Sequence, residues 1–321
     1  MGISGIDSLT YGVADVAASR RFFEDWGLTL LDGAPDGAPV LQLADGGTIC
    51  LRAASDAALP ALPPGYGQAP PSTLREVIWG VHHASDLQAI EAELARDRVV
   101  TRDADGTLHT RDDLGYAIGF RVTRRKALTH EAVRDNGPGR IGRIDARAEA
   151  ALPYRVRQQR MVHLVYWVPR QSQQMLKFYV ERLGFHVTES VKNVGHFLRC
   201  GASGDHHNLF LQTRGDNFGF QHVAFELRNI DDVMFCGQHM EQQGWKSHLG
   251  PGRHVLGSNV YWYFWCPAGG IVEAGCDLDF ITDHWPANEL EVVPAGGSSW
   301  FVRAEDAGLR PGHGDWPQFK A

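Results

Sequence analysis

Three side chains of the metal-binding kind stand alone inside apolar runs of the second half of the chain. They are His163 in RMVHLVYWV, His222 in FGFQHVAFEL and Glu273 in GGIVEAGC. Taken singly, each fits a hydrogen-bonded core histidine or a carboxylate paired with an arginine, because a buried polar group needs a partner. One metal ion would satisfy all three together, and their matching places in a repeated pattern favour that interpretation.

The spacing and the types of these residues indicate which metal chemistry they serve. They are 59 and 51 residues apart, so they come from three strands rather than from one helix. Two imidazoles and one carboxylate leave adjacent coordination positions open, which is the ligand set of non-haem Fe(II) oxygenases. A zinc ion with three protein ligands and a water molecule is the alternative that the residue types leave open.

An internal repeat predicts the elements that position these side chains. Residues 8–28 and 162–185 both give an apolar run, a polar break, a helical apolar face and a glycine near its end. Weaker copies begin at residues 75 and 218, and strand-like segments follow each copy. We therefore predict an α+β protein of four βαβββ modules arranged as two pairs, at residues 1–125 and 158–278.

Two segments fall outside the predicted modules. Residues 126–157, rich in Arg, Gly and Pro, are predicted to be a connector. Three of its glycines match the G-x-G-x-x-G spacing of dinucleotide-binding loops: Gly137, Gly139 and Gly142. Because Pro138 interrupts them and no apolar strand precedes them, we interpret the segment as a loop. Residues 279–321 form a tail that either closes over the site or packs on the surface, and it contains three tryptophans: Trp285, Trp300 and Trp316.

Composition and charge exclude several classes of protein. The chain has 31 Lys and Arg against 38 Asp and Glu, a net charge of −7, so there is no overall positive field to attract nucleic acid or an anionic membrane. The chain shows neither a secretory leader nor a long apolar run. Its five cysteines form no C-x-x-C pair and are typical of reduced thiols. These features predict a cytoplasmic protein without nucleic-acid or membrane partners.

The modules and the three candidate ligands together resemble the two-domain type I extradiol ring-cleavage dioxygenases of the vicinal oxygen chelate superfamily. The resemblance covers residues 1–278 and implies two vicinal-oxygen-chelate domains, each a curled mixed sheet with flanking helices. It implies that His163, His222 and Glu273 bind Fe(II), with Mn(II) as the alternative ion. It also implies a homo-oligomer that acts on a substituted catechol and O2 and opens the ring beside the diol.

The resemblance implies three catalytic residues as well. His207, the second member of a His-His pair, precedes His222 by 15 residues and matches the family's acid–base histidine. Tyr263 precedes Glu273 by ten residues, and His254 precedes Tyr263 by nine; both match residues that orient substrate oxygen. Where the family often carries Asn-Asp after the residue matching His254, this chain has Val255-Leu256-Gly257, which implies a changed pocket.

The first module pair is expected to lack these ligands. The approximate counterparts of His163, His222 and Glu273 in it are Ser8, Trp79 and Gly119, none of which replaces an imidazole or a carboxylate. By resemblance, this half is expected to serve structure or subunit packing.

Three other functions compete with ring cleavage. An enzyme resembling 4-hydroxyphenylpyruvate dioxygenase would have the same ligand set, but the offsets of His207 and Tyr263 and the shorter chain argue against it. A zinc- or nickel-dependent glyoxalase-like isomerase is the second alternative. The third is a binding protein of the bleomycin-resistance kind, which would not need a buried His, His, Glu set.

Overall fold

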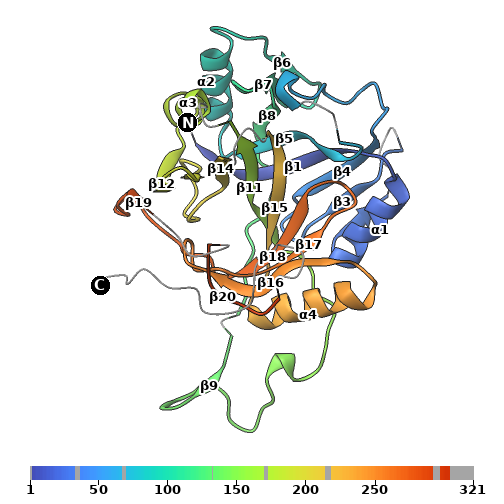
Figure 1. The fold of residues 1–321 in the computed structure, drawn as a ribbon, viewed down its shortest axis with the longest axis vertical. Helices are drawn as coiled ribbons and strands as arrows, with labels where there is room; N and C mark the ends of the chain where they lie inside the picture. The colour runs from blue at the N-terminus through green and yellow to red at the C-terminus, as the bar shows by residue number, and fades with distance from the viewer. Residues whose placement is uncertain are drawn as a thin grey trace.

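The computed structural model describes residues 2–32, 37–66, 70–131, 133–169, 173–213, 218–291 and 297–303. Four consecutive β-α-β-β-β modules account for most of them (Figure 1). The first contains β1 (Ile3–Val13), α1 (Val16–Trp26), β2 (Thr29–Leu31), β3 (Val40–Gln42) and β4 (Thr48–Ala53). The second, after the short helix η1 (Pro64–Tyr66), contains β5 (Thr73–Val81), α2 (Ala84–Leu94), β6 (Thr101–Arg102), β7 (Leu108–Arg111) and β8 (Ala117–Val122).

The second half repeats this order. The third module contains β11 (Arg160–Val168), α3 (Gln173–Lys177) with its π-helical continuation η3 (Phe178–Arg182), β12 (His186–Val191), β13 (Gly195–Arg199) and β14 (Leu209–Thr213). The fourth contains β15 (Gly219–Glu226), α4 (Ile230–Gln242), β16 (Ser247–His254), β17 (Val260–Trp265) and β18 (Ile271–Cys276). The prediction of an α+β protein built from four βαβββ modules is confirmed.

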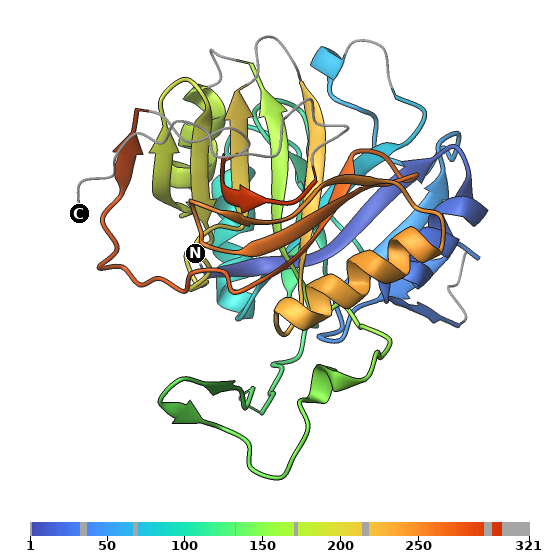
Figure 2. The ribbon, with the colours of Figure 1, turned by 60° about the horizontal axis from the view of Figure 1, so that its bottom comes forward.

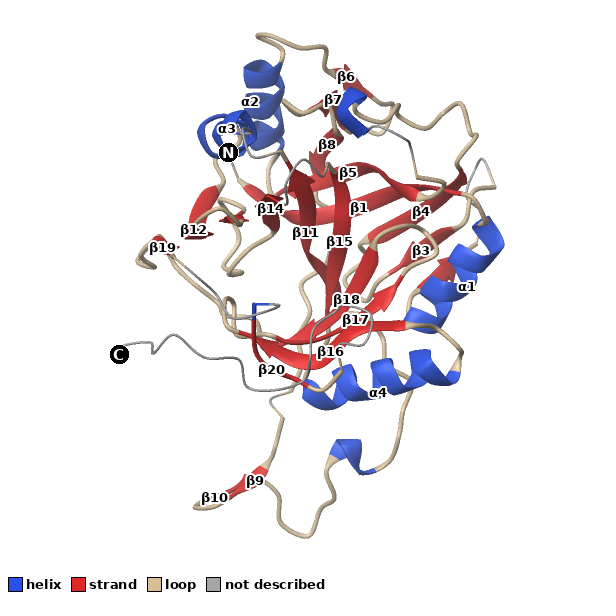
Figure 3. Ribbon diagram, in the orientation of Figure 1, coloured by secondary structure: helices blue, strands red, loops and turns tan. Residues whose placement is uncertain are grey.

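Each pair of modules forms one mixed sheet, and the two sheets have the same internal order (Figure 3). The first runs β2-β3-β4-β1-β5-β8-β7-β6, and the second contains β12-β13-β14-β11-β15-β18-β17-β16. In both, the first strand of a module pairs in parallel with its last strand and antiparallel with the first strand of the partner module. The central strands β11, β15 and β18 are therefore neighbours.

The helices join the two halves along two seams. Helix α1 begins at Asp15, whose side chain accepts from the Ala18 N–H, and ends at Gly27, where φ is 104°; glycine allows this left-handed conformation without strain. Its buried Phe22 packs edge-on against Trp245 beyond α4. At the other seam, ion pairs join η3 to the α2 region. One apolar core runs through both sheets, and no helix among the described residues is long and apolar enough to span a membrane.

A buried carboxylate at this junction predicts a pH dependence of stability. Asp112 accepts the Leu114 and Tyr116 N–H groups and the Tyr179 hydroxyl of the other half, and its burial raises its pKa from 3.8 to about 7. Between these values the unfolded chain releases a proton that the folded protein keeps. The free energy of unfolding should therefore fall as pH rises through this range, by up to about 4 kcal/mol for a three-unit shift.

The variant Asp112→Asn tests this expectation, because an amide has a similar shape and no ionisable proton. Urea unfolding at about pH 5 and pH 8 should show the variant gaining stability over the unchanged protein at the higher pH. An equal difference in stability at both pH values would contradict the prediction.

Residues 126–157, the arm, protrude from the body over most of their length (Figure 2), but at their end Tyr154 packs on Phe235 and Val156 is buried in the core. Strands β9 (Asn136–Gly137) and β10 (Arg140–Ile141) form a hairpin at the tip of the arm, and the short helix η2 (Glu149–Ala151) lies on its return. The three glycines that match a dinucleotide motif lie in or beside this small hairpin, where no strand-to-helix turn exists.

The described part of the tail adds strands to the second sheet. Strand β19 (Asn288–Leu290) pairs in parallel with β12, and β20 (Ser298–Phe301) pairs antiparallel with β16. Trp285 lies edge-on to His206 at 6.0 Å between ring centroids, and Trp300 pairs with Arg253 in register. Trp316 lies outside the described residues. The tail therefore both packs on the sheet and reaches the neighbourhood of the predicted site.

Candidate metal centre

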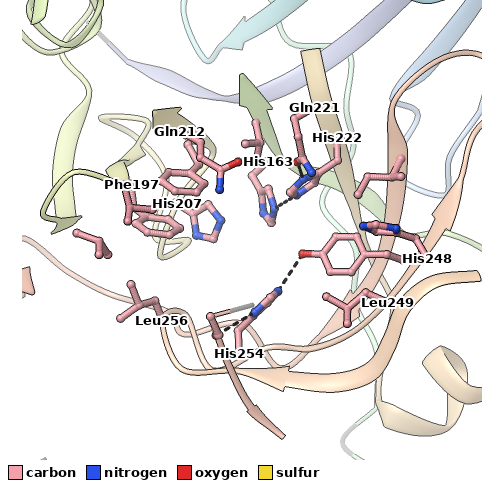
Figure 4. Close-up of a pocket in the computed structure, with 17 residues that line it drawn as sticks. His163, Phe197, His207, Gln212, Gln221, His222, His248, Leu249, His254 and Leu256 are labelled. Carbon is pink, nitrogen blue, oxygen red and sulfur yellow. Dashed lines mark hydrogen bonds between the residues drawn. The ribbon is translucent and has the colours of Figure 1, made fainter. Parts of the chain in front are cut away.

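The structure brings the three predicted ligands together on neighbouring strands. His163 lies on β11, His222 on β15 and Glu273 on β18, and Ala224 is the register partner of both His163 and Glu273. Side chains on a strand alternate between its faces, so all three point to the same side of the sheet. All are buried, with exposed fractions of 4%, 7% and 0%. Figure 4 shows the two imidazoles side by side in the wall of the cavity, with their ring nitrogens directed toward each other.

Their geometry fits a metal ion. The Nε2 atoms of His163 and His222 are 3.1 Å apart, and the Oε2 atom of Glu273 lies 3.3 Å from each. Two ligand atoms that are each about 2.1 Å from one ion at a right angle are about 3 Å apart. The buried Oε2 atom has no hydrogen-bond partner among the described residues. Two imidazole nitrogens and one carboxylate oxygen thus converge on one point. A divalent cation at that point would accept a lone pair from each of them.

The protonation of these groups suits the same purpose. Burial lowers the pKa of His222 to about 4. Burial alone raises the pKa of Glu273, but the two imidazoles that lie 3.3 Å from its Oε2 atom outweigh burial and hold that pKa well below its usual range. At neutral pH the site therefore offers an unprotonated His222 imidazole and a carboxylate, the forms that bind metal. Among the described residues, only this trio gathers three such ligand atoms within 4.8 Å.

Asn259 holds the carboxylate and was not anticipated from the sequence. Its Nδ2 donates to Oε1 of Glu273 at 2.7 Å, and its side chain is 4% exposed. This bond fixes the carboxylate so that the other oxygen, Oε2, faces the imidazoles. In the sequence, Asn259 follows Gly257 and Ser258 and is indistinguishable from an ordinary turn residue.

Removing this bond should weaken metal binding. We expect Asn259→Ala to raise the dissociation constant for Fe(II) by about 10-fold to 100-fold, because partners that orient a ligand typically contribute that much affinity. A titration against a chelator of known affinity measures it. Asn288→Ala, on the exposed strand β19, is the matched control. Equal affinities in the two variants would show that the bond does not orient the ligand.

A second group lies beside the centre and consists of His207, His206 and Glu189, joined by hydrogen bonds. We call it the His207 chain; His207 itself lies in the segment just before β14. The His207 ring lies 4.1 Å from the His163 ring, centroid to centroid. His207 Nδ1 lies 3.0 Å from Nδ1 of His206, whose Nε2 lies 3.0 Å from a Glu189 carboxylate oxygen. The carboxylate accepts from His206 Nε2–H, so His206 Nδ1 accepts from His207 Nδ1–H. This assignment leaves His207 Nε2 as an acceptor beside the cavity.

Burial and then the neighbouring imidazoles lower the pKa of His207 well below its usual value, so it is neutral when the site is empty of substrate. His206 and Glu189 are residues that sequence reasoning did not assign. The His-His pair pointed to His206, but Glu189 is 17 residues away on β12 and only the sheet brings it near.

Tyr263 and His254 form the opposite side of the centre. Tyr263 is the register partner of Glu273, and its hydroxyl lies 2.9 Å from His254 Nε2 (Figure 4). His254 Nδ1 lies 3.3 Å from the Gly297 carbonyl oxygen, to which it donates. Burial raises the pKa of Tyr263 well above its usual value, so the phenol keeps its proton and donates it to His254 Nε2.

A cavity of about 330 Å³ connects these groups. The five predicted residues His163, His207, His222, His254 and Tyr263 line it together with apolar side chains, while Glu273 lies behind the imidazoles with no exposed surface. Gly297 of the tail also lines it. The structure therefore places all six predicted site residues around one space that is large enough for a small aromatic ring.

The register of the first sheet corrects one expected counterpart. Strand β11 opposes β15 with a shift after Met161, and β1 opposes β5 with the same shift after Ile6. Val165 faces His222 in the second sheet, and its equivalent Thr10 faces Glu76 in the first. The counterpart of His222 is therefore Glu76; the prediction of Trp79 was wrong.

The other two counterparts have the predicted identities. Ser8 holds the place of His163, and Gly119 holds that of Glu273, because Gly119 pairs with Ile78 as Glu273 pairs with Ala224. Glu76 lies 2.8 Å from His109 Nδ1, and His109 is the register partner of Gly119. In the first sheet, a carboxylate and an imidazole that bind each other thus stand where the second sheet has His222 and Tyr263.

Comparisons with known proteins agree with this architecture. Residues 160–269 match the sequence model of the Glyoxalase/Bleomycin resistance protein/Dioxygenase superfamily. Metapyrocatechase 2 from Cupriavidus necator is 31% identical over 138 residues, which is 42% of this chain and 42% of that protein. The match thus spans less than half of the length of that relative.

Solved structures match over nearly the whole chain. A Mn(II)-bound glyoxalase from Novosphingobium aromaticivorans superposes with a TM-score of 0.72 at 21% identity, over 99% of this chain and 98% of that one. A halotolerant catechol dioxygenase gives 0.71 at 19% identity, over 97% of both chains. At these identities the likeness establishes the fold. The sequence match to the Glyoxalase/Bleomycin resistance protein/Dioxygenase superfamily thus lies in the second module pair, and both module pairs share the fold of these solved structures.

Proposed function

We propose that the protein is an Fe(II)-dependent extradiol dioxygenase that opens the ring of a substituted catechol beside its two hydroxyl groups and incorporates both atoms of O2. The observation that carries this proposal is the convergence of His163, His222 and Glu273, with His207 on one side and the Tyr263–His254 pair on the other. The partial match to a metapyrocatechase and the shared fold of a catechol dioxygenase support it.

His163, His222 and Glu273 would hold the iron, with Mn(II) as the alternative ion. Such an ion, when bound, lowers the pKa of a catechol hydroxyl, holds both substrates side by side and relays electrons between them. Three protein ligands leave room for the diol oxygens and for O2. The carboxylate held by Asn259 keeps its second oxygen directed at the site.

The residues around the centre orient substrate and move protons. The Tyr263 hydroxyl donates to His254, so its oxygen lone pairs are available to a substrate hydroxyl. His207 Nε2 is placed to take a proton from the bound substrates and to return it later. When it does so, the positive charge that forms is balanced through His206 by the Glu189 carboxylate. The apolar side chains of the cavity wall limit the access of water while the ring opens.

An isomerase is the alternative that a specific observation favours. The fold is shared at similar TM-scores by a Mn(II)-bound glyoxalase and by a catechol dioxygenase, and fold alone does not fix the reaction. The presence of His207 beside the three ligands favours ring cleavage, because that reaction needs an acid–base group next to the metal in addition to the metal itself.

The test is anaerobic reconstitution with Fe(II), followed by addition of catechol, 3-methylcatechol or 2,3-dihydroxybiphenyl and then of air. We expect iron-dependent O2 uptake and a yellow ring-opened product. Protein loaded with redox-inert Zn(II) is the control, and it should take up no O2. Stoichiometric Fe(II) without O2 uptake would favour the isomerase, and no stoichiometric metal would favour a binding protein.

We further propose that the protein is a cytoplasmic homo-oligomer in which the arm of residues 126–157 contacts a second copy. The arm has seven Lys and Arg and four Asp and Glu, a net charge of +3. Because the whole chain has a net charge of −7, the residues outside the arm have a net charge of −10. Its Ile141 and Ile144 side chains are 66% and 78% exposed. Opposite charge and exposed apolar groups suit self-association.

The double variant Ile141→Asp with Ile144→Asp tests this role of the arm. Light scattering should show a lower mass of the particle in solution than for the unchanged protein, and an unchanged mass would refute the role of the arm.

A further inference from the structure

Apolar side chains make up much of the cavity wall beyond the predicted ligands. The apolar side chains that line it include Val191, Val194, Phe197, Phe210, Leu249 and Leu256. Phe197 and Phe210 stack face to face at 3.9 Å with an interplanar angle of 5°. Figure 4 shows Phe197 beside His207, and Leu249 and Leu256 on the side of His254. A ring substituent that extends from a diol at the metal centre would meet hydrocarbon.

The described lining residues include no lysine and no arginine. The cations nearest to them in the sequence bind carboxylates elsewhere. Lys192, next to Val191, pairs with Glu291 at 3.0 Å, and Arg253, next to His254, pairs with Asp277 at 2.8 Å. Arg199, two residues beyond Phe197, pairs with Asp283. Each of these charges is held by an acidic partner instead of lining the cavity.

Apart from the predicted ligand and catalytic side chains, the polar groups of the lining are the uncharged amides of Gln212 and Gln221 and the His248 imidazole, which packs edge-on against Trp265. Gln212 Oε1 accepts from Trp167 Nε1 at 3.0 Å, and Gln221 Oε1 contacts the His222 ring. Glu273, behind the imidazoles, is a carboxylate and adds no positive group. An anionic substituent would lose its water and find no lysine or arginine in the described lining to pair with, which is unfavourable in a largely apolar site.

We propose that the substrate is a catechol with an uncharged, apolar ring substituent and that the cavity rejects catechols that carry a carboxylate. This inference rests on the proposed ring-cleavage function and deepens it. Each additional buried methylene should tighten binding by about fourfold. A carboxylate on the same carbon skeleton should weaken binding by about 100-fold or more.

Matched pairs of ligands test the charge alone. They are 4-isobutylcatechol against 3,4-dihydroxyphenylacetate and 3-isopropylcatechol against 2,3-dihydroxybenzoate, which have similar shapes within each pair. Their dissociation constants for the Fe(II)-loaded full chain are measured without O2, at about pH 8, where an ordinary imidazole is neutral. Unsubstituted catechol reports the diol site by itself. We expect the neutral member of each pair to bind about 100-fold more tightly.

The outcomes separate this inference from the proposed function. Catechol that binds, together with equal or tighter binding of the carboxylates, would overturn the inference and leave ring cleavage standing. Failure of catechol and of every derivative to bind the metal-loaded protein would overturn both.

A cation placed in the wall should reverse the preference. Leu256 lies at the partly exposed rim of the cavity, so Leu256→Arg can be accommodated with its charge beside the substituent. We expect it to improve the binding of 3,4-dihydroxyphenylacetate relative to 4-isobutylcatechol by about 10-fold or more. Leu256→Met, which keeps the size without the charge, is the control and should leave the ratio unchanged. If Leu256→Arg does not change the ratio of the two dissociation constants, the absence of a positive charge from the wall is not the cause of the selectivity.

Discussion

His163→Ala is expected to lose stoichiometric Fe(II) and at least about 1,000-fold of the rate of ring cleavage. The change removes one of three convergent ligand atoms and leaves Oε2 of Glu273 with a single imidazole neighbour, His222. Two protein ligands bind a divalent ion weakly and do not fix its open positions. Iron content after anaerobic loading and gel filtration, followed by O2 uptake with catechol, measures both losses.

A second histidine variant separates loss of a ligand from loss of fold. His196 lies on β13 and bonds to Ser190 at 2.8 Å, away from the cavity lining. His196→Ala should keep one equivalent of iron and its activity. Both variants should retain the circular dichroism spectrum of the unchanged protein. A His163→Ala protein that keeps full iron and full activity would disprove the assignment of the centre.

The ligand trio could be predicted from the sequence because three independent signals coincide in it. His163, His222 and Glu273 each interrupt an apolar strand, where a polar side chain without a partner is costly. They stand at corresponding places of a repeat, and a repeated module returns equivalent strand positions to one face of a sheet. The same repeat predicted the four modules, since each one shows the change from strand to helix periodicity.

The register of the strands could not be predicted in the same way. A shift between Met161 and His163 in one sheet, and between Ile6 and Ser8 in the other, moves the next pairs by one residue, as far as Val165 and Thr10. Such irregularities leave no clear trace in an apolar pattern, because the residues on both sides remain hydrophobic. The pairing of Thr10 with Glu76 shows that the counterpart of His222 lies three residues before the predicted Trp79.

The residues that support the ligands were equally out of reach. Asn259 contacts Glu273 across two strands, and Glu189 contacts His206 across three. Asn259 follows a turn, where asparagine is common, and Glu189 lies within β12 among other polar residues, so neither stands out in the sequence. Their roles come from tertiary distances alone. The sequence therefore revealed the polar residues that interrupt apolar strands. It did not reveal the polar residues that lie in polar segments, because such residues are common there.

His207→Asn is expected to keep the metal and to lower kcat by about 100-fold to 10,000-fold, the range typical of a positioned acid–base group. His207 contributes no atom to the trio within 4.8 Å, so iron binding should persist. An asparagine amide can replace Nδ1–H as the donor to His206, but it has no atom at the place of Nε2. Substrate binding should change little, because Tyr263 and His254 lie on the other side of the centre.

The partner variant Glu189→Gln distinguishes a proton-handling role from a structural one. An amide oxygen can still accept from His206 Nε2–H, so the hydrogen bond survives while the negative charge that balances a protonated His207 is lost. We expect a smaller fall in kcat than in His207→Asn, about 10-fold, with an unchanged KM and full iron content. If the His207 chain served only packing, Glu189→Gln would keep full kcat and His207→Asn would lose thermal stability in proportion to its activity. A selective loss of kcat in both variants, with the metal retained, would therefore identify the step that His207 performs as proton transfer to or from the bound substrates.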